Sequence, residues 1–263
     1  MKWLKGLLIN FQFFTSVPIP LTLPMDNLHL EKAIKTFPIL GLIQGGIYSS
    51  LLYFLVEWTP FSSLTAALVV WVAGIVVTGG IHLDGWMDAS DAYFSYRDQE
   101  KRLEIMADPR SGAFSVLSVI VLLSTKFFFI YEITLKNDLS TYLLILLIPF
   151  FGKMIMGVLL LKGQSAKNEG LGVLFKQAAT SRTLWIYPLF SILIIGGLVW
   201  IVPSLIIGAV ILLVASLLML LFILNKTNRW FGGITGDVLG AGVEGTEWLL
   251  WMMLWLLHYF VMG

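Results

Sequence analysis

The sequence predicts an all-α, polytopic integral membrane protein with about seven transmembrane helices and one amino-terminal interfacial helix. The chain of 263 residues is 58% hydrophobic and only 13% charged, more apolar than a soluble core requires. It contains several apolar runs of about 20 residues, the length of helix that crosses the hydrocarbon core of a bilayer. Its lysines and arginines gather in alternate connections between these runs, as they do in multi-pass membrane proteins.

The first 20 residues are expected to form a helix at the membrane surface. Trp3, Leu7, Phe11 and Phe14 recur at helical spacing, and the two prolines that follow end the pattern. An amphipathic helix of this kind suits the interface better than a span. The prolines also stand where a signal peptide would have its small-residue cleavage site, so we do not expect a cleaved signal.

Seven further segments are apolar enough to span the bilayer, and several contain the glycine or proline that membrane helices tolerate. No internal repeat, low-complexity stretch or separable soluble segment interrupts them, so residues 1–263 are predicted to form a single membrane-embedded domain. The chain has no cysteine, which excludes disulfides and cysteine-based metal or nucleophile sites. The predicted spans are 39–56, 64–82, 113–131, 142–162, 183–200, 205–224 and 247–262.

The distribution of basic residues predicts which side each connection faces. If the spans cross alternately, fourteen of the seventeen lysines and arginines fall on one side and Lys136 alone falls on the other, while Lys126 and Lys153 lie inside spans. By the positive-inside rule the richer side is cytoplasmic. Most acidic residues and the three long polar connections share that side, so we expect the chemistry to take place there. These connections are 83–112, 163–182 and 225–246.

Three carboxylates stand at the end of the second apolar run. Asp84, Asp88 and Asp91 are offset by four and seven residues, so in a helix they fall within about 60° of arc on one face. Oxygen ligands arranged in this way suit a hard divalent cation such as Mg²⁺. Inserting each carboxylate into lipid would cost about 2.5–3.5 kcal/mol, which argues that a membrane protein keeps them for use.

Polar residues after this cluster are suited to phosphate. Arg110 lies in the motif Asp-Pro-Arg-Ser-Gly at 108–112 and can bind phosphate oxygens through two parallel hydrogen bonds. Phosphoryl transfer needs such charge neutralisation more than covalent help. The stretch 97–104 carries both signs of charge, and a solvated amphipathic helix explains it equally well.

A glycine-rich connection near the carboxyl end is the second candidate for substrate contact. Five glycines within 232–242 allow close approach of the backbone to a ligand and leave amide groups free for phosphate. Gly236 is the predicted substrate contact, and Asp237 is a predicted metal ligand. Tight helix packing is the alternative explanation of the glycines. Residues 166–172 form a third glycine-containing patch, for which an ordinary turn is at least as good an explanation.

Three further polar residues have two explanations each. Lys153 lies near the middle of a predicted span, where a cation is costly, so it is predicted to contact an anionic substrate or else to pair with another buried polar group. Lys126 lies nearer the outer end of its span and is expected to snorkel to the interface. His82 adjoins the carboxylates and is predicted to bind substrate or to act as an acid or base, with capping of the helix end as the alternative.

These motifs resemble those of the cobalamin synthase family, the adenosylcobinamide-GDP ribazoletransferases. The sequence GGIHLDGWMDASD at 79–91 is similar to the family signature, and four other blocks match in the family order along most of the chain. This chain has Pro109 where the family often has serine, and Lys153 where it often has arginine, whose planar fork lysine lacks. The other blocks are 37–45, 102–114, 169–172 and 235–241.

The resemblance implies a transferase of the bacterial cytoplasmic (inner) membrane whose active site faces the cytoplasm. Adenosylcobinamide-GDP and α-ribazole, or α-ribazole 5′-phosphate, would give adenosylcobalamin, or its 5′-phosphate, with release of GMP, a late step of vitamin B12 assembly. The lipid bilayer is a further expected partner, nucleic acid is not, and a homo-oligomer is left open.

The resemblance also implies roles for the candidate residues. Mg²⁺ would bridge the pyrophosphate of the substrate. One of Asp84, Asp88 and His82 would orient or deprotonate the attacking ribose hydroxyl. The implied metal ligands are Asp84, Asp88, Asp91 and Asp237, and the implied substrate contacts are Arg110, Gly236 and Lys153.

Two other functions compete with this one. A phosphatidyltransferase of the CDP-alcohol type also uses clustered aspartates after a membrane helix, but its motif requires Ala-Arg shortly after the first aspartate, and here Asp88 stands four residues after Asp84. A transporter with an aspartate relay would place its carboxylates at bilayer depth, among inverted repeats. The acids of this chain fall at the predicted cytoplasmic boundary instead.

Overall fold

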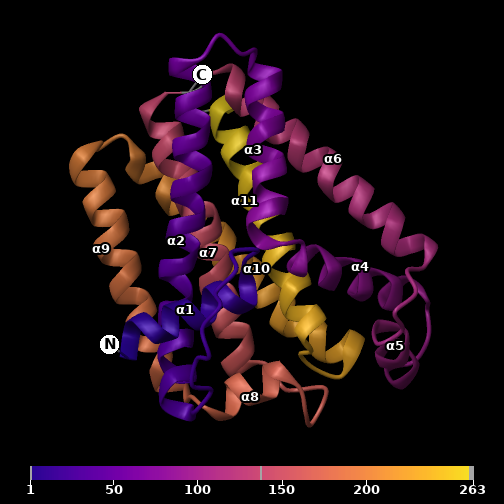
Figure 1. Ribbon diagram of the computed structural model, residues 1–263. Helices are drawn as coiled ribbons and strands as arrows, with labels where there is room; N and C mark the ends of the chain where they lie inside the picture. Colours follow the sequence, from indigo (N-terminus) through magenta and orange to yellow (C-terminus); the bar gives the residue numbers. More distant parts are fainter. Residues whose placement is uncertain (1, 137, 261–263) are drawn as a thin grey trace.

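Longer apolar helices form the frame of the molecule, and short helices gather toward one end of it (Figure 1). The computed structural model describes residues 2–136 and 138–260, in which every regular element is a helix. The longer helices are α2 (Asn27–Trp58), α3 (Ser63–Thr78), α6 (Ala113–Leu135), α7 (Leu139–Lys162), α9 (Ile186–Ile201), α10 (Leu205–Phe231) and α11 (Gly236–Phe260). The shorter ones are α1 (Lys2–Phe14), α4 (Ile81–Phe94), α5 (Gln99–Met106), α8 (Leu171–Gln177) and the 3₁₀ helix η1 (Ser181–Trp185).

Five helical segments of the described chain are long and apolar enough to cross a membrane, or six if α3 and α4 count as one broken span. The all-α polytopic class is confirmed, although the number of spans falls below seven. The predicted last span belongs to α11, which begins at Gly236 and is not among the five; positions 261 and 262 lie outside the described residues. The five are Asn27–Trp58, Ala113–Leu135, Leu139–Lys162, Ser181–Ile201 and Leu205–Phe231.

The predicted span 64–82 ends early, and this break creates the acidic helix α4. Gly79 and Gly80 have φ angles of +64° and +75°, a left-handed conformation that glycine adopts without steric cost. The chain therefore leaves α3 at Thr78 and turns by 86° into α4. Because of this turn, α4 runs across the bundle, outside the five spanning segments (Figure 1).

Helix α1 is fixed to α2 by close packing and by one buried amide. Gly6 lies so near α2 that an added Cβ would sit 2.7 Å from the Ala33 nitrogen. The side-chain nitrogen of Asn10 donates to the Ala33 carbonyl oxygen at 2.8 Å and to the Thr36 hydroxyl oxygen at 2.9 Å. This docking holds Phe14, the last residue of α1, edge-on to an aromatic ring of α2.

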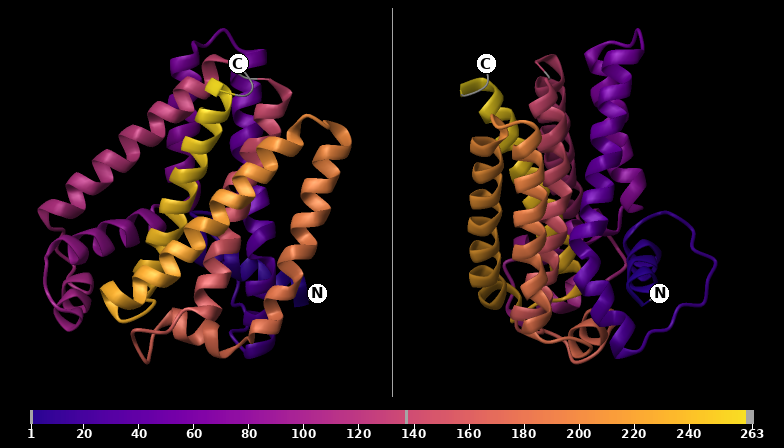
Figure 2. Two further views of the ribbon diagram at one scale, coloured as in Figure 1. Left: turned by 180° about the vertical axis from the view of Figure 1, so that it is seen from behind. Right: turned by 90° about the vertical axis from the view of Figure 1, so that its left-hand side faces the viewer.

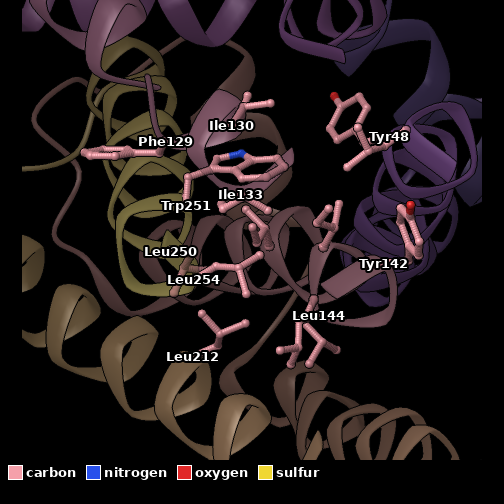
Figure 3. Packing of buried hydrophobic residues seen from close by; sticks show 14 of the residues in the cluster. Tyr48, Phe129, Ile130, Ile133, Tyr142, Leu144, Leu212, Leu250, Trp251 and Leu254 are labelled. Carbon is pink, nitrogen blue, oxygen red and sulfur yellow. The ribbon is translucent and has the colours of Figure 1, made fainter. Parts of the chain in front are cut away.

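The main apolar core lies where α2, α6, α7, α10 and α11 meet. Gly41 and Gly45 bring the backbone of α2 against that of α7, where an added Cβ would strike the carbonyls of Pro149 and Leu146. Figure 3 shows part of this core, in which Trp251 of α11 lies among side chains from the neighbouring helices. Burial of large apolar side chains here fixes α11 against α7.

Helix α4 is held against the first turns of α11 by two glycines. A Cβ added to Gly85 would lie 2.6 Å from the Asp237 carbonyl oxygen, and one added to Gly240 would lie 3.2 Å from the Cα of His82. Larger side chains at these positions would separate the two helices. Figure 1 and the left view of Figure 2 show that α4 starts beside the lower end of α11 and leads away from it toward α5. The acidic helix and the beginning of α11 therefore share one site.

Candidate active site

The aspartates of α4 and α11 form one electrostatic cluster. Asp84, Asp88 and Asp91 lie along α4, and Asp237 lies in the first turn of α11. Burial, together with repulsion from the other three carboxylates, raises the pKa of Asp88 to about 6. Burial also raises the pKa of Asp237, against the opposing effect of nearby Lys167. The fold thus brings together carboxylates from two distant segments, as the sequence predicts.

None of these four carboxylates takes part in an ion pair among the described residues. Asp237 accepts a hydrogen bond from the Thr235 hydroxyl at 3.4 Å. Oxygen donors that repel one another and have no ion-pair partner fit Mg²⁺ in chemical type. In the part of the chain that the structure describes, no three acidic or histidine side chains stand close enough to ligate one ion. Magnesium binding therefore stays a prediction.

Asp91 faces the start of α6. Its carboxylate oxygens occupy the space that a Cβ on Gly112 would fill, so a larger residue at the position that precedes α6 would displace the Asp91 side chain. The unpaired backbone N–H groups at the beginning of a helix favour a negative charge placed there. Asp91 thus connects α4 to α6 while it still contributes to the repulsion on Asp88.

A cavity of about 170 Å³ is lined by half of the predicted site residues. His82, Asp84, Gly236 and Asp237 all line it. Its other walls come from α1, α2, α7, α8 and α11 and are mostly apolar, and they include Gly172 of the third predicted patch. Two glycine-bearing segments and two carboxylates therefore meet at a single opening.

His82 lies in the inner wall of this cavity. Its side chain is buried, and its Nε2 atom has no hydrogen-bond partner. Burial lowers the pKa of His82 well below its ordinary value, so the imidazole is neutral at physiological pH. The ring lies nearly parallel to that of Phe14, with centroids 6.1 Å apart. His82 is the second residue of α4, and no side chain caps the start of this helix. Capping of the helix end therefore does not explain the buried Nε2 atom.

The structure does not bring Arg110 to the cavity. Its side chain is 87% exposed and forms a bidentate ion pair with Asp108, with Nη2 and Oδ2 2.6 Å apart. The guanidinium holds the pKa of Asp108 down, at about 2. Phosphate binding by Arg110 stays a prediction, and it would require the arginine to exchange this partner.

Lys153 is fully buried and has a partner in the protein. Its ammonium lies 3.4 Å from Glu247, which supports the alternative that a buried polar group, rather than substrate, neutralises it. Lys126 lies 3.1 Å from Glu244 and 3.9 Å from Glu247, in the same interior cluster. The expectation that Lys126 snorkels to the interface is wrong, because its side chain is drawn inward to these two acids.

Sequence reasoning missed the aromatic wall of the cavity. Phe14, Phe37 and Phe175 come from α1, α2 and α8, and their ring centroids lie 5.5–6.2 Å apart. The sequence offered two indications of these residues: Phe37 is the first residue of the family block 37–45, and Phe175 lies three residues after the block 169–172. Neither signal indicates that the three rings converge, because separation along the chain says nothing about contact in space.

A larger cavity, of about 660 Å³, is lined by none of the predicted site residues. Trp86, Tyr93 and Phe94 form its α4 wall, and α6, α10 and α11 supply the rest. At about 100° per residue the side chains of Trp86 and Tyr93 point away from Asp84 and Asp88. The α4 wall of the larger cavity therefore carries no carboxylate.

Comparisons with known proteins identify the family of the chain. The family model described as cobalamin-5-phosphate synthase matches residues 6–255. A protein of Geobacillus sp. (strain WCH70) is 37% identical over 265 residues, covering 98% of each chain. A Geobacillus kaustophilus protein is 38% identical, with 98% of each chain covered, and one of Clostridioides difficile is 31% identical, with 97% and 99% covered. All three are named adenosylcobinamide-GDP ribazoletransferase.

No solved structure matches the fold. The match of the family model, by contrast, extends over nearly the whole sequence and includes both α4 and the glycine-rich start of α11. The two segments that build the acidic cavity thus lie within the matched region. The chain belongs to the cobalamin-5-phosphate synthase family.

Proposed function

We propose that this chain joins adenosylcobinamide-GDP to α-ribazole, or to α-ribazole 5′-phosphate, and releases GMP. One observation carries the proposal: unpaired carboxylates from α4 and α11 meet glycine-bearing segments at the opening of a single cavity. A pyrophosphate substrate requires cation-binding oxygens and free backbone amides in one place. The printed names of the relatives supply the identity of both substrates.

The chemistry is a phosphoryl transfer. A ribose hydroxyl oxygen forms a bond to the phosphorus attached to the cobinamide arm, the anhydride bond breaks, and GMP leaves with the bridging oxygen. Asp84 or Asp88 accepts the hydroxyl proton, since Asp84 is exposed at the cavity and Asp88 follows it by one helical turn on the same face of α4. The low exposure of His82 makes it the less suitable proton acceptor for a bulky substrate.

Mg²⁺ is the proposed cofactor. Asp84, Asp88 and Asp237 would hold it, with Asp91 beside them, once their side chains move closer together than in this structure, and it would neutralise charge on the pyrophosphate when bound. Gly236 starts α11, lines the cavity, and has no atom within 4 Å of an added Cβ, so a phosphate oxygen can approach its backbone N–H group. Arg110 is the proposed further phosphate contact, whereas Lys153 has no part in the proposal.

Turnover by the purified full-length protein in nanodiscs tests the function. We expect GMP release that requires adenosylcobinamide-GDP, α-ribazole and Mg²⁺ together, with the corrinoid product identified by mass spectrometry. Release of CMP from a CDP-linked lipid would instead establish the phosphatidyltransferase alternative. Solute uptake into liposomes that is lost on Asp84→Asn substitution would establish the transporter.

The proposed location of the site is the cytoplasmic face of the inner membrane. Since the chain has no cysteine, single cysteines report sidedness directly. Position 168, for an Asn168→Cys substitution, lies in the connection before α8, which lines the cavity. Position 61, for a Phe61→Cys substitution, lies in the connection between α2 and α3, at the other end of these helices. A membrane-impermeant maleimide should label Phe61→Cys in intact cells and Asn168→Cys only after lysis. The reverse pattern would place the site outside.

A further inference from the structure

The acidic cavity has two chemically different ends. Its rim carries Asp84 and Gly236, which are exposed, and Asp237 beside them. Its floor is formed by buried apolar side chains, among them Phe37 and Phe175, which are 1% and 2% exposed. A ligand that fills it must therefore present a flat or branched apolar part inward and a polar part outward.

One buried polar atom interrupts the apolar floor. His82 is 3% exposed, and its Nε2 atom makes no hydrogen bond. A buried polar group without a partner costs about 1–3 kcal/mol, and a ligand atom that pairs with it would remove this cost. The floor thus accepts an aromatic group that carries a single hydrogen-bonding atom.

The size of the cavity limits which part of the substrates can enter. About 170 Å³ is less than the roughly 300–1,000 Å³ that encloses a whole drug-sized ligand, so it holds one ring system and not a molecule. The corrin macrocycle, with its four five-membered rings, is too large. Guanine carries polar atoms around its edge, and an apolar floor with one polar side chain would leave most of them unpaired.

We propose that this cavity binds the dimethylbenzimidazole base of α-ribazole, and that the Nε2–H of His82 donates a hydrogen bond to the unsubstituted ring nitrogen of that base. The inference rests on the proposed function and names the acceptor subsite within it. The base is a flat, methyl-bearing bicyclic arene, and its second nitrogen is its single hydrogen-bond acceptor once the first carries the ribose. Both properties match the floor described above.

This placement orients the reaction. With the base between the phenylalanine rings and Leu239, the ribose lies at the rim, where its hydroxyl groups meet Asp84 and Asp237. The larger cavity does not offer the same orientation, because none of these carboxylates lines it. His82 is then a specificity-determining residue that recognises the base through a hydrogen bond, and the carboxylates accept the proton.

The test compares binding and turnover for His82→Phe and His82→Gln in full-length protein in nanodiscs. Phenylalanine keeps the ring but removes the donor, so the Kd for α-ribazole alone should rise about tenfold to a hundredfold. The KM for α-ribazole should rise with it, while the KM for adenosylcobinamide-GDP and kcat at saturating α-ribazole stay within about threefold. Glutamine can still donate and should restore part of the affinity.

An analogue isolates the hydrogen bond itself. A dimethylindole riboside has a carbon in place of the acceptor nitrogen, so wild-type protein should bind it about tenfold more weakly than α-ribazole. His82→Phe should bind the two ligands equally. Phe222→Leu, in the larger cavity, is the matched control and should leave the Kd for α-ribazole unchanged.

The outcomes separate this inference from the proposed function. Equal binding of both ligands by wild-type protein, or an unchanged Kd for α-ribazole in His82→Phe, would overturn the base subsite even if GMP is released normally. A loss of kcat with unchanged KM would likewise overturn it and make His82 a proton acceptor. Discrimination between the two ligands without any GMP release would support the subsite and contradict the transferase.

Discussion

Two groups of acids in one helix behave in opposite ways. Asp237 lies in the first turn of α11 at the cavity rim, without a cation beside it close enough for an ion pair in the described structure. Glu244 and Glu247 lie farther along the same helix, buried and paired with Lys126 and Lys153. A buried charge needs a partner for the fold to form, so the paired acids are structural. The carboxylate left unpaired is the one available to a ligand.

The strongest test of this contrast is Asp84→Asn. Asp84 of α4 lines the same cavity as Asp237 and likewise has no ion-pair partner in the described structure, so we expect its substitution to lower turnover at least about a hundredfold while the protein inserts and folds normally. GMP release at saturating substrates and the midpoint of thermal unfolding measure the two properties. Activity retained at ordinary Mg²⁺ concentrations would remove Asp84 from the metal site.

Glu247→Gln tests the paired group and should mainly affect stability. It leaves Lys153 buried without its counter-charge, which costs about 3–5 kcal/mol in comparable buried pairs. We expect a clear shift in the SDS-induced unfolding transition, with near-normal turnover per folded molecule. The double variant Lys153→Met with Glu247→Leu removes both charges and should recover much of the loss. Unchanged stability with lost turnover would show that this pair belongs to the active site after all.

Gly85→Ala tests whether the two helices must touch. The new Cβ would lie 2.6 Å from the Asp237 carbonyl oxygen, so α4 and α11 must separate, at a cost of about 1–3 kcal/mol. Separation also moves Asp237 from Asp84, so activity should fall together with stability. Gly74→Ala in α3 is the control, since no atom lies within 4 Å of its added Cβ. If Gly85→Ala is as active as Gly74→Ala, close helix contact is not needed.

The smallest expected effect concerns pH and Asp88. Its pKa is about 6 in the folded protein, against an ordinary value of 3.8 for aspartate, so the folded state holds more protons between these values. Stability therefore falls as pH rises through this window, and the loss stays constant above it. Without divalent metal, Asp88→Asn should unfold at a higher temperature than wild type at pH 7.5, and the difference should vanish near pH 4. Wild type that is more stable at pH 7.5 would contradict the repulsion.

The sequence identifies the unpaired acids better than the paired ones. Asp84, Asp88 and Asp91 share a helical face whatever the tertiary structure, so periodicity alone predicts their arrangement. The pairing of Lys153 with Glu247 depends on α7 and α11 packing together, which periodicity does not encode. For the same reason the sequence leaves two explanations for Lys153 open, and contact geometry supports one of them.

The path of the chain after α3 was the least predictable feature. Hydropathy continues without interruption to residue 82, so the predicted span includes the glycine pair. Each of these glycines is compatible with a membrane helix, and only their left-handed conformation ends α3. The convergence of three phenylalanines from α1, α2 and α8 could not be predicted from the sequence either, because it depends on how these helices pack together.

The close contact between Gly85 and Asp237 also bears on how the protein is made. The two residues lie in the first third and the last tenth of the chain, so α4 is synthesised and inserted long before its partner exists. Until α11 is in place, the acids of α4 have no second wall beside them. Synthesis of the last helix therefore completes the site, and a ribosome-bound chain that stops before α11 would be inserted in the membrane yet inactive.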